Sequence, residues 1–428
     1  MNIKTRNGLL LAAIITSNLS WADQTSQTPV NTSNDLAGEA RGELTYASMV
    51  GDKSTSFSED RYRSTIDEIE AIEGPYGGSL TQNLIGLGLT MQDQGNHNEA
   101  IEHFTRAVHI NKINEGLYNL NQVPVLERLI ESYVAQGNWE DANDKHQYLF
   151  WLHQRNFGNA DPRMLPIINK LSNWHLNAYT LDSNSGLFHH LINAHLLFKL
   201  AVNIIDNNYG QNDLRLIEAL RGLTVTNYFL KTFQSHANQR LNQAAKNGQA
   251  PTSDERARLE QFMINSYSSG KHAISRMVHV YSTNPEAQPY SATEAQVELA
   301  DWYLLFNKWH SALSTYQDAY DQLAAESGNQ EVADKLFSRP VPLPDLPLID
   351  TQAPKGDEDT PYVLVAFDVT AFGKARNIEI LESFPKDIAR NSAKVKRSLK
   401  VAKFRPRFAN GAPALTERVT HRYLFPKK

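Results

Sequence analysis

Apolar residues change their spacing near the end of this chain. From Val363 to Val369 every second residue is large and apolar, and this alternation predicts a β-strand. After a turn that contains Gly373, the stretch Asn377 to Glu382 alternates again, which predicts a hairpin. Residues Ile388 to Val401 have the mixed three- and four-residue spacing of an amphipathic helix, and Val419 to Phe425 reads as a third strand. We therefore expect a small antiparallel sheet of three strands with one helix packed on one face. The last strand is expected to lie at an edge of this sheet.

Three earlier segments share a helical frame of apolar and small residues. The first holds Leu84, Leu87, Gly88, Met91, Gly95, Ala100, Phe104 and Ala107; the second Leu126, Leu129, Tyr133, Gly137, Trp139, Ala142 and Leu149; the third Leu299, Ala300, Tyr303, Trp309, Ala312, Tyr316 and Ala319. This frame resembles the tetratricopeptide repeat (TPR) family, in which small residues at helix crossings let antiparallel helices pack closely. Ala100 and Ala142 are 42 residues apart, a longer step than the usual ~34 residues. The fold class is therefore mainly α, a TPR-like solenoid over residues 61–337 followed by a small α+β domain.

Short motifs in residues 361–428 add a second resemblance. Gly373, Ser383, Phe404-Arg-Pro406 and Gly411-Ala-Pro413 accompany the strand, strand, helix, strand order. Together they resemble the C-terminal domain of TonB, the periplasmic protein that couples inner-membrane energy to outer-membrane receptors. The resemblance implies a free last strand that pairs with an extended receptor peptide. The side chains that would bias this pairing are Arg418, His421 and Arg422, and Thr420 is the position where a proline should remove one backbone donor.

The start of the chain predicts export. Lys4 and Arg6 precede an apolar run from Leu9 to Ile15, and Ser20-Trp-Ala22 supplies small residues before Asp23, so residues 1–22 read as a signal peptide cleaved after Ala22. No later apolar run is expected to reach the about twenty residues that a membrane span needs. The expected location is the periplasm of a Gram-negative bacterium, with an uncleaved anchor as the alternative. Residues 23–60, rich in Ser, Thr, Asn and Gly, predict a disordered segment, and residues 338–360 a Pro-rich, semi-rigid linker.

Charge divides the chain into opposed parts. Residues 361–428 carry 15 Lys and Arg against 5 Asp and Glu, whereas residues 23–360 carry 25 against 42. Five of the cations cluster where the last helix is expected: Lys394, Lys396, Arg397, Lys400 and Lys403. This basic face either binds an anionic partner, such as a cell-wall polymer, a receptor segment or the acidic solenoid, or is a solvated helix surface.

Signatures of catalysis are weak. The chain has no cysteine, which excludes disulfides, a lipid-bearing cysteine and thiolate metal sites. His189 and His190 lie five or six residues from His195, a spacing that does not put two imidazoles on one helix face. Ser268-Ser-Gly-Lys271 matches a hydrolase motif without its companions, and phosphate-loop, zinc-protease and calcium-loop patterns are missing. We expect no enzymatic activity, no cofactor, no metal and no nucleic-acid partner.

Two functional classes remain open. One is a non-catalytic periplasmic scaffold or adaptor that does not span the membrane and binds a periplasmic or outer-membrane protein, with peptidoglycan as a further candidate partner. The other is a TonB-type energy transducer or accessory. The scaffold is favoured because a cleavable signal replaces the membrane helix of TonB, the Pro-rich spacer is short, and Pro361-Tyr362 reverses the Tyr-Pro order expected before the first strand.

Overall fold

The structure, a computed structural model, describes residues 55–181, 187–234, 252–325, 330–344, 360–385 and 389–425. These residues form two compact units that divide between Ile167 and Ile168. The predicted signal peptide and residues 23–54 of the predicted disordered segment lie outside the described residues. The rest of that segment was assigned wrongly, because helix α2 (Thr55–Glu73) already includes residues 55–60.

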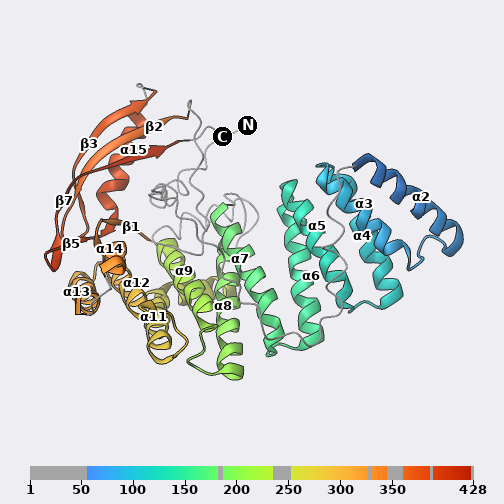
Figure 1. The fold of residues 1–428 in the computed structure, drawn as a ribbon, viewed down its shortest axis with the longest axis horizontal. Helices are drawn as coiled ribbons and strands as arrows, with labels where there is room; N and C mark the ends of the chain where they lie inside the picture. Colours follow the sequence, from blue (N-terminus) through green and yellow to red (C-terminus); the bar gives the residue numbers. More distant parts are fainter. Residues whose placement is uncertain are drawn as a thin grey trace. The chain divides into compact units, whose positions relative to one another are not determined.

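The first unit consists of antiparallel helices (Figure 1). After α2 come α3 (Leu80–Asp93), α4 (His97–Glu115), the 3₁₀ turn η1 (Leu120–Gln122), α5 (Val123–Ala135), α6 (Trp139–Phe157) and the turn η2 (Pro162–Met164). The loops that connect these helices repeat with the same 42-residue step as the predicted frame. Asn114 and Asn156, 42 residues apart, each close the end of a helix by donating from Nδ2 to a loop carbonyl, that of Tyr76 at 2.9 Å and that of Tyr118 at 2.8 Å.

Small residues set how closely α3 and α4 approach. Ala100 and Phe104 of α4 are fully buried. A Cβ atom added at Gly88 of α3 would lie 2.6 Å from Cε1 of Phe104, so the ring occupies the space that glycine leaves open. The predicted role of small residues at this helix crossing is therefore met by contacts in the structure.

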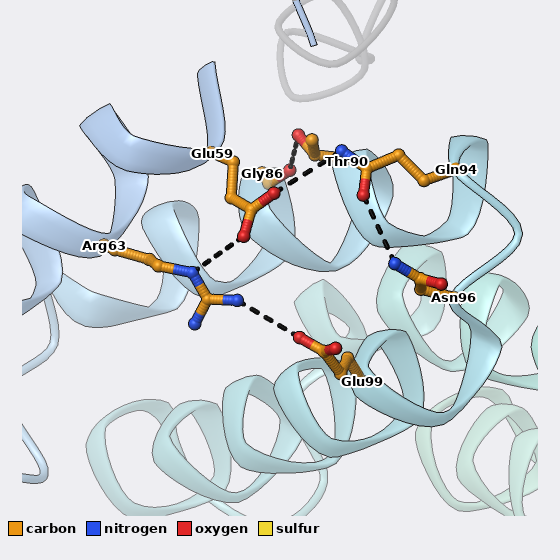
Figure 2. Close-up of polar contacts among 7 residues, drawn as sticks. All are labelled: Glu59, Arg63, Gly86, Thr90, Gln94, Asn96 and Glu99. Atoms are coloured by element: carbon orange, nitrogen blue, oxygen red, sulfur yellow. Dashed lines mark hydrogen bonds and ion pairs between the residues drawn. The ribbon is translucent and has the colours of Figure 1, made fainter. Parts of the chain in front are cut away.

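Polar contacts tie α2 to the following pair of helices (Figure 2). Arg63 donates from Nε to Glu59 of its own helix at 3.0 Å and from Nη2 to Glu99 of α4 at 3.1 Å. Gln94, which follows α3, donates to the other oxygen of Glu59 at 3.5 Å. The Arg63 and Glu99 side chains are almost half exposed, so this ion pair fixes geometry more than it adds stability, at about 0–1 kcal/mol.

The second unit continues the helical pairs. It holds α7 (Leu165–Leu181), which starts just before the division, α8 (Leu187–Tyr209), α9 (Leu216–Gln234), α11 (Ser253–Thr283), α12 (Ser291–Leu305), α13 (Trp309–Ala325) and α14 (Gln330–Phe337). Ala300, Ala312, Tyr316 and Ala319 of the third predicted frame are fully buried where α12 and α13 pack together.

Helix α8 qualifies the prediction about membrane spans. Among the described residues, Phe188–Tyr209 is the one segment long and apolar enough, by length and composition, to cross a membrane. The expectation that no later run reaches this length was therefore wrong. More than half of the segment is nevertheless buried, and Phe188, Leu191 and Phe198 pack in a core cluster with side chains of α9 and α11.

A three-stranded antiparallel sheet follows the helices in the order β3-β2-β7. Its strands are β2 (Tyr362–Val369), β3 (Ala375–Phe384) and β7 (Thr416–Leu424). Alternate residues of β2 face the helix α15 (Ala389–Val401), where Val363, Val365 and Phe367 pack with Val395 and Leu399. The predicted strand, strand, helix, strand order is present, with strand ends that differ by one to three residues. The predicted last strand lies at one edge of the sheet.

Four short strands were not predicted. β4 (Lys403–Arg405) pairs with β1 (Val341–Leu343), and β5 (Arg407–Ala409) pairs with β6 (Ala412–Ala414) through a tight turn. The assignment of residues 338–360 to a linker was therefore wrong at its beginning: Leu343 is buried, and β1 joins the helical pairs to the terminal domain. Residues 345–359 lie outside the described residues.

Candidate interaction site on the terminal domain

Among the described residues, no strand pairs with the outer edge of β7. The Phe425 amide, next to the end of β7, donates to the Pro361 carbonyl at 2.7 Å, and the register Val365↔His421, Ala366↔Thr420 continues this pairing without a shift. Since backbone groups of an antiparallel strand alternate in direction, Tyr423 and His421 point their amides toward β2. Thr420 and Arg422 therefore point theirs toward the open edge.

The four predicted edge residues have different surroundings. Thr420 and Arg422 are exposed, and the Arg422 guanidinium lies 3.6 Å from the centre of the Tyr362 ring. The Tyr362 hydroxyl in turn donates to Glu382 at 2.6 Å. This stack joins all three strands on the face opposite α15, and the bond to Glu382 followed by slight desolvation raises the pKa of Tyr362.

His421 and Arg418 contact other residues of the sheet. His421 is half-buried against Tyr423, with ring centres 4.5 Å apart, and burial lowers its pKa. Arg418 has a positive φ of 50° and donates its amide to the Asp368 carboxylate at 2.9 Å. That backbone bond, with the side chain of Asn377, lowers the pKa of Asp368. Both residues thus have roles in shaping the edge.

The five cations of the predicted basic face lie on two different elements, α15 and β4. Lys396, Arg397 and Lys400 are exposed on α15 and Lys394 is half-buried, where burial and then the nearby Arg390 lower the pKa of the Lys394 ammonium. The placement of Lys403 on the same helix was wrong, because α15 ends at Val401 and Lys403 belongs to β4.

Lys403 is instead held against the helical pairs. Its ammonium donates to the carbonyls of Leu304 and Leu305, at 3.0 and 2.8 Å, and to Oδ1 of Asn307 at 2.6 Å. These carbonyls end α12, where a cation also complements the helix dipole. Burial, and next the nearby Lys374, lower the pKa of Lys403 to about 8.

A buried ion pair lies two residues further along β4. Arg405 donates from Nε and Nη2 to the two carboxylate oxygens of Asp301 in α12, at 3.0 and 2.5 Å. The Tyr316 hydroxyl of α13 donates to the same carboxylate at 2.5 Å. Burial, followed by the charge of Asp301, raises the pKa of Tyr316 well above its usual value, so the phenol remains a hydrogen-bond donor.

Apolar and backbone contacts complete this junction. The Phe408 ring of β5 lies 5.0 Å from that of Tyr320 in α13 and 4.7 Å from that of Phe337 in α14, centre to centre. Gly373, at φ 67°, accepts at its carbonyl from the Phe404 amide, and a Cβ there would lie 2.0 Å from the Phe404 oxygen. We name Lys403, Arg405, Asp301, Tyr316 and Phe408, with the β1–β4 pair, the clamp.

Sequence reasoning missed the clamp, although a signal was present. Asp301 interrupts the apolar run Leu299 to Leu304, and Arg405 stands between Phe404 and Pro406. A charge inside an apolar run is seldom buried without a partner. Each of the two runs therefore indicates a buried charge that needs a partner of opposite charge. The sequence alone does not show that Asp301 and Arg405, 104 residues apart, are each other's partners.

The histidine and serine motifs of the sequence lie in separate surroundings. His195 is buried beside Thr226, 3.1 Å from its hydroxyl, and His190 contacts His175 between ring nitrogens 2.8 Å apart. Ser268 donates to the Asn265 carbonyl, while Lys271 lies over the ring of Tyr303. In the part of the chain that the structure describes, no group of three or more His, Asp or Glu side chains could hold a metal ion.

Comparisons with known proteins give likenesses in structure alone. No family model matches the chain, and no curated protein matches it. The crystal structure of BtubC (BKLC) from P. vanneervenii is 13% identical with a TM-score of 0.35, over 65% of this chain and 94% of that one. The TPR-like repeats of a kinesin light chain from Podosopora anserina are 14% identical with a TM-score of 0.37, over 59% of this chain and 99% of that one.

Proposed function

We propose that this protein is a non-catalytic scaffold of the bacterial cell envelope, exported to the periplasm by the signal at residues 1–22. The helical pairs bind a protein partner in the manner of a TPR solenoid. The basic terminal domain binds a second partner, either peptidoglycan or another envelope protein. Mass measurement of the mature protein tests the export step, since its chain should begin at Asp23.

The clamp is the observation that carries this proposal. It fixes the terminal domain to α12, α13 and α14 by a buried ion pair, by aromatic packing and by strand pairing. The same domain leaves the cations of α15 exposed on another surface. Such an attachment holds the α15 surface in place relative to α12, α13 and α14, which suits a scaffold that presents its binding surfaces at set positions.

Binding to purified sacculi tests the basic surface. Glutamine replacements at Lys394, Lys396, Arg397 and Lys400 should weaken binding of the full chain, and added salt should weaken binding of the parent. The matched control removes the same charge from exposed positions of the helical pairs, with glutamine at Arg61, Arg128, Arg256 and Arg258. Equal binding by the two variants would show that the α15 surface has no special role.

The open edge of β7 supports a second candidate, a TonB-type energy transducer or accessory. An extended receptor peptide could pair with the outward backbone groups of Thr420 and Arg422. Thr420→Pro removes one outward donor, whereas Thr420→Val keeps it and serves as the control. Micromolar binding of a TonB-recognised receptor peptide that is lost in the proline variant and kept in the valine variant would favour the transducer over the scaffold.

A further inference from the structure

The first unit carries an exposed aromatic surface next to two cations that lie over its rings. Leu117 and Tyr118 lie in the loop after α4, and Tyr148 and Trp151 lie on α6. The Trp151 ring lies 5.4 Å from that of Tyr118 and 5.7 Å from that of Tyr148, centre to centre. Leu117, Tyr118 and Trp151 are 49%, 43% and 39% exposed. We name these four residues, with Lys112 and Arg155, the aromatic patch.

The cations of the patch face rings instead of carboxylates. The Lys112 ammonium lies 4.3 Å from the centre of the Tyr148 ring, and the Arg155 guanidinium 5.3 Å from that of Tyr118. Within residues 55–167, Arg63, Arg106, Arg128 and Arg163 each form an ion pair. No such carboxylate contact is found for Lys112 or Arg155 in this described stretch.

Nearby charges leave the patch positive. Burial, and next the charge of Lys145, lower the pKa of Lys112, so a third cation lies close by. The Glu115 carboxylate is turned toward the loop, where it accepts from the amides of Asn119 and Asn121 at 2.6 Å each. Three cations, Lys112, Lys145 and Arg155, therefore lie at or near the patch, while the nearby Glu115 carboxylate is already hydrogen-bonded in the loop.

The helical repeat accounts for one ring pair of the patch, since Tyr76 and His109, 42 residues before Tyr118 and Trp151, also face each other with ring centres 5.9 Å apart. It does not account for Tyr148. The Asn114 and Asn156 bonds recur 42 residues apart because both loops need them. At the positions 42 residues before Tyr148 and Trp151 stand Arg106 and His109. Arg106 is ion-paired to Glu70, so the same helical frame is satisfied by a charged residue where the patch has a tyrosine.

The charge of the patch selects among its ligands. Aromatic clusters often bind cations through their ring faces, but two of these rings already have their own cations. Exposed tryptophan, tyrosine and arginine together are the residues that most often dominate protein interfaces. We propose that the aromatic patch binds an acidic peptide segment of a partner protein, with an apolar side chain against Trp151 and carboxylates against Lys112 and Arg155. This deepens, and rests on, the proposed scaffold function by naming the chemistry of one partner.

An array of synthetic peptides tests the proposal with the full-length protein. Each peptide carries one aromatic or aliphatic residue flanked either by Asp and Glu or by Lys and Arg. We expect binding to the acidic set, weakened by salt, and reduced about tenfold or more by Trp151→Ala or Arg155→Glu. Arg61→Glu, a reversal of an exposed cation on α2, should leave affinity within about twofold.

Three results would overturn the proposal. They are binding to no peptide, equal binding to acidic and basic peptides, and equal effects of Arg155→Glu and Arg61→Glu. Vesicles of phosphatidylglycerol are included in a separate arm, and binding to them in preference to the peptides would assign the patch to a membrane surface. Sacculus binding is measured on the same samples: if it persists while peptide binding fails, only this inference is lost, and if both fail, the scaffold function is lost as well.

Discussion

Replacing Arg405 with alanine should strongly destabilise the second unit. The side chains of Arg405 and Asp301 are 6% and 9% exposed. Removal of the guanidinium therefore leaves a buried carboxylate without its counter-charge, which typically costs about 3–5 kcal/mol. The Tyr316 hydroxyl still donates to Asp301, so we expect about 3 kcal/mol, the lower end of this range.

Calorimetry and hydrogen exchange measure this loss. For a unit of this size each kcal/mol lowers the melting temperature by about 2–4 °C, so Arg405→Ala should lower it by about 6–12 °C. The chain has two compact units and need not unfold in one step. Exchange of the Phe404 amide, bonded to Gly373, therefore reports the junction separately and should accelerate.

A matched variant and a double mutant distinguish the ion pair from general disruption. Arg407 of β5 donates one hydrogen bond, to the Leu415 carbonyl at 3.0 Å, and Arg407→Ala should cost about 1 kcal/mol or less. Asp301→Ala combined with Arg405→Ala should be more stable than Arg405→Ala alone, because the unpaired carboxylate is gone. Equal stability of the double and single variants, or a loss no larger than that of Arg407→Ala, would refute the reasoning.

Two further predictions concern the helical cores. Ala100→Leu should overpack the crossing of α3 and α4 and cost about 1–3 kcal/mol, whereas an unchanged melting temperature would mean that Ala100 is not at a tight crossing. Burial lowers the pKa of His195 to about 4, with a smaller contribution from Lys199; because the unfolded histidine titrates near ~6.5, the unfolded chain binds the proton first. Stability should therefore be full above pH ~6.5 and fall by about 3 kcal/mol as the pH drops toward 4, a slope that His195→Gln should flatten in denaturant titrations at several pH values.

How far the sequence predicts this structure depends on the length of each pattern. The alternation from Val363 to Val369 extends over a whole strand and identified β2 to within one residue. β1 and β4 are three residues long, and β1 contains a proline, so neither shows a period. Their pairing depends on contacts distant in sequence, which no local pattern encodes.

The same limit explains the error at Lys403. Its spacing from Lys400 matches a helical turn, and the charge pattern alone places it on α15. The helix ends at Val401, and Lys403 beyond it donates to the carbonyls of Leu304 and Leu305. Lys396, Arg397 and Lys400 do lie on α15, as their spacing predicted.

The clamp also bears on the choice between the two proposed functions. A transducer that reaches across a compartment needs a terminal domain free to move on its spacer, and a flexible stretch of about two dozen residues could extend up to ~70 Å. The pairing of β1 with β4 and the burial of Arg405 oppose such movement. A scaffold has no need of that reach.

Distance measurements can separate a clamped domain from a tethered one. Because the chain has no cysteine, spin labels can be attached through Ser314→Cys on α13 and Glu379→Cys on β3, both exposed. Pulsed electron paramagnetic resonance should give one narrow distance distribution in the otherwise unchanged protein, which should broaden when Arg405→Ala is added. Ala100→Leu, a change in the other unit, is the control and should leave the distribution narrow. A broad distribution before any change at Arg405 would mean that the clamp does not hold in solution, and the argument for a rigid scaffold would then give way to the transducer.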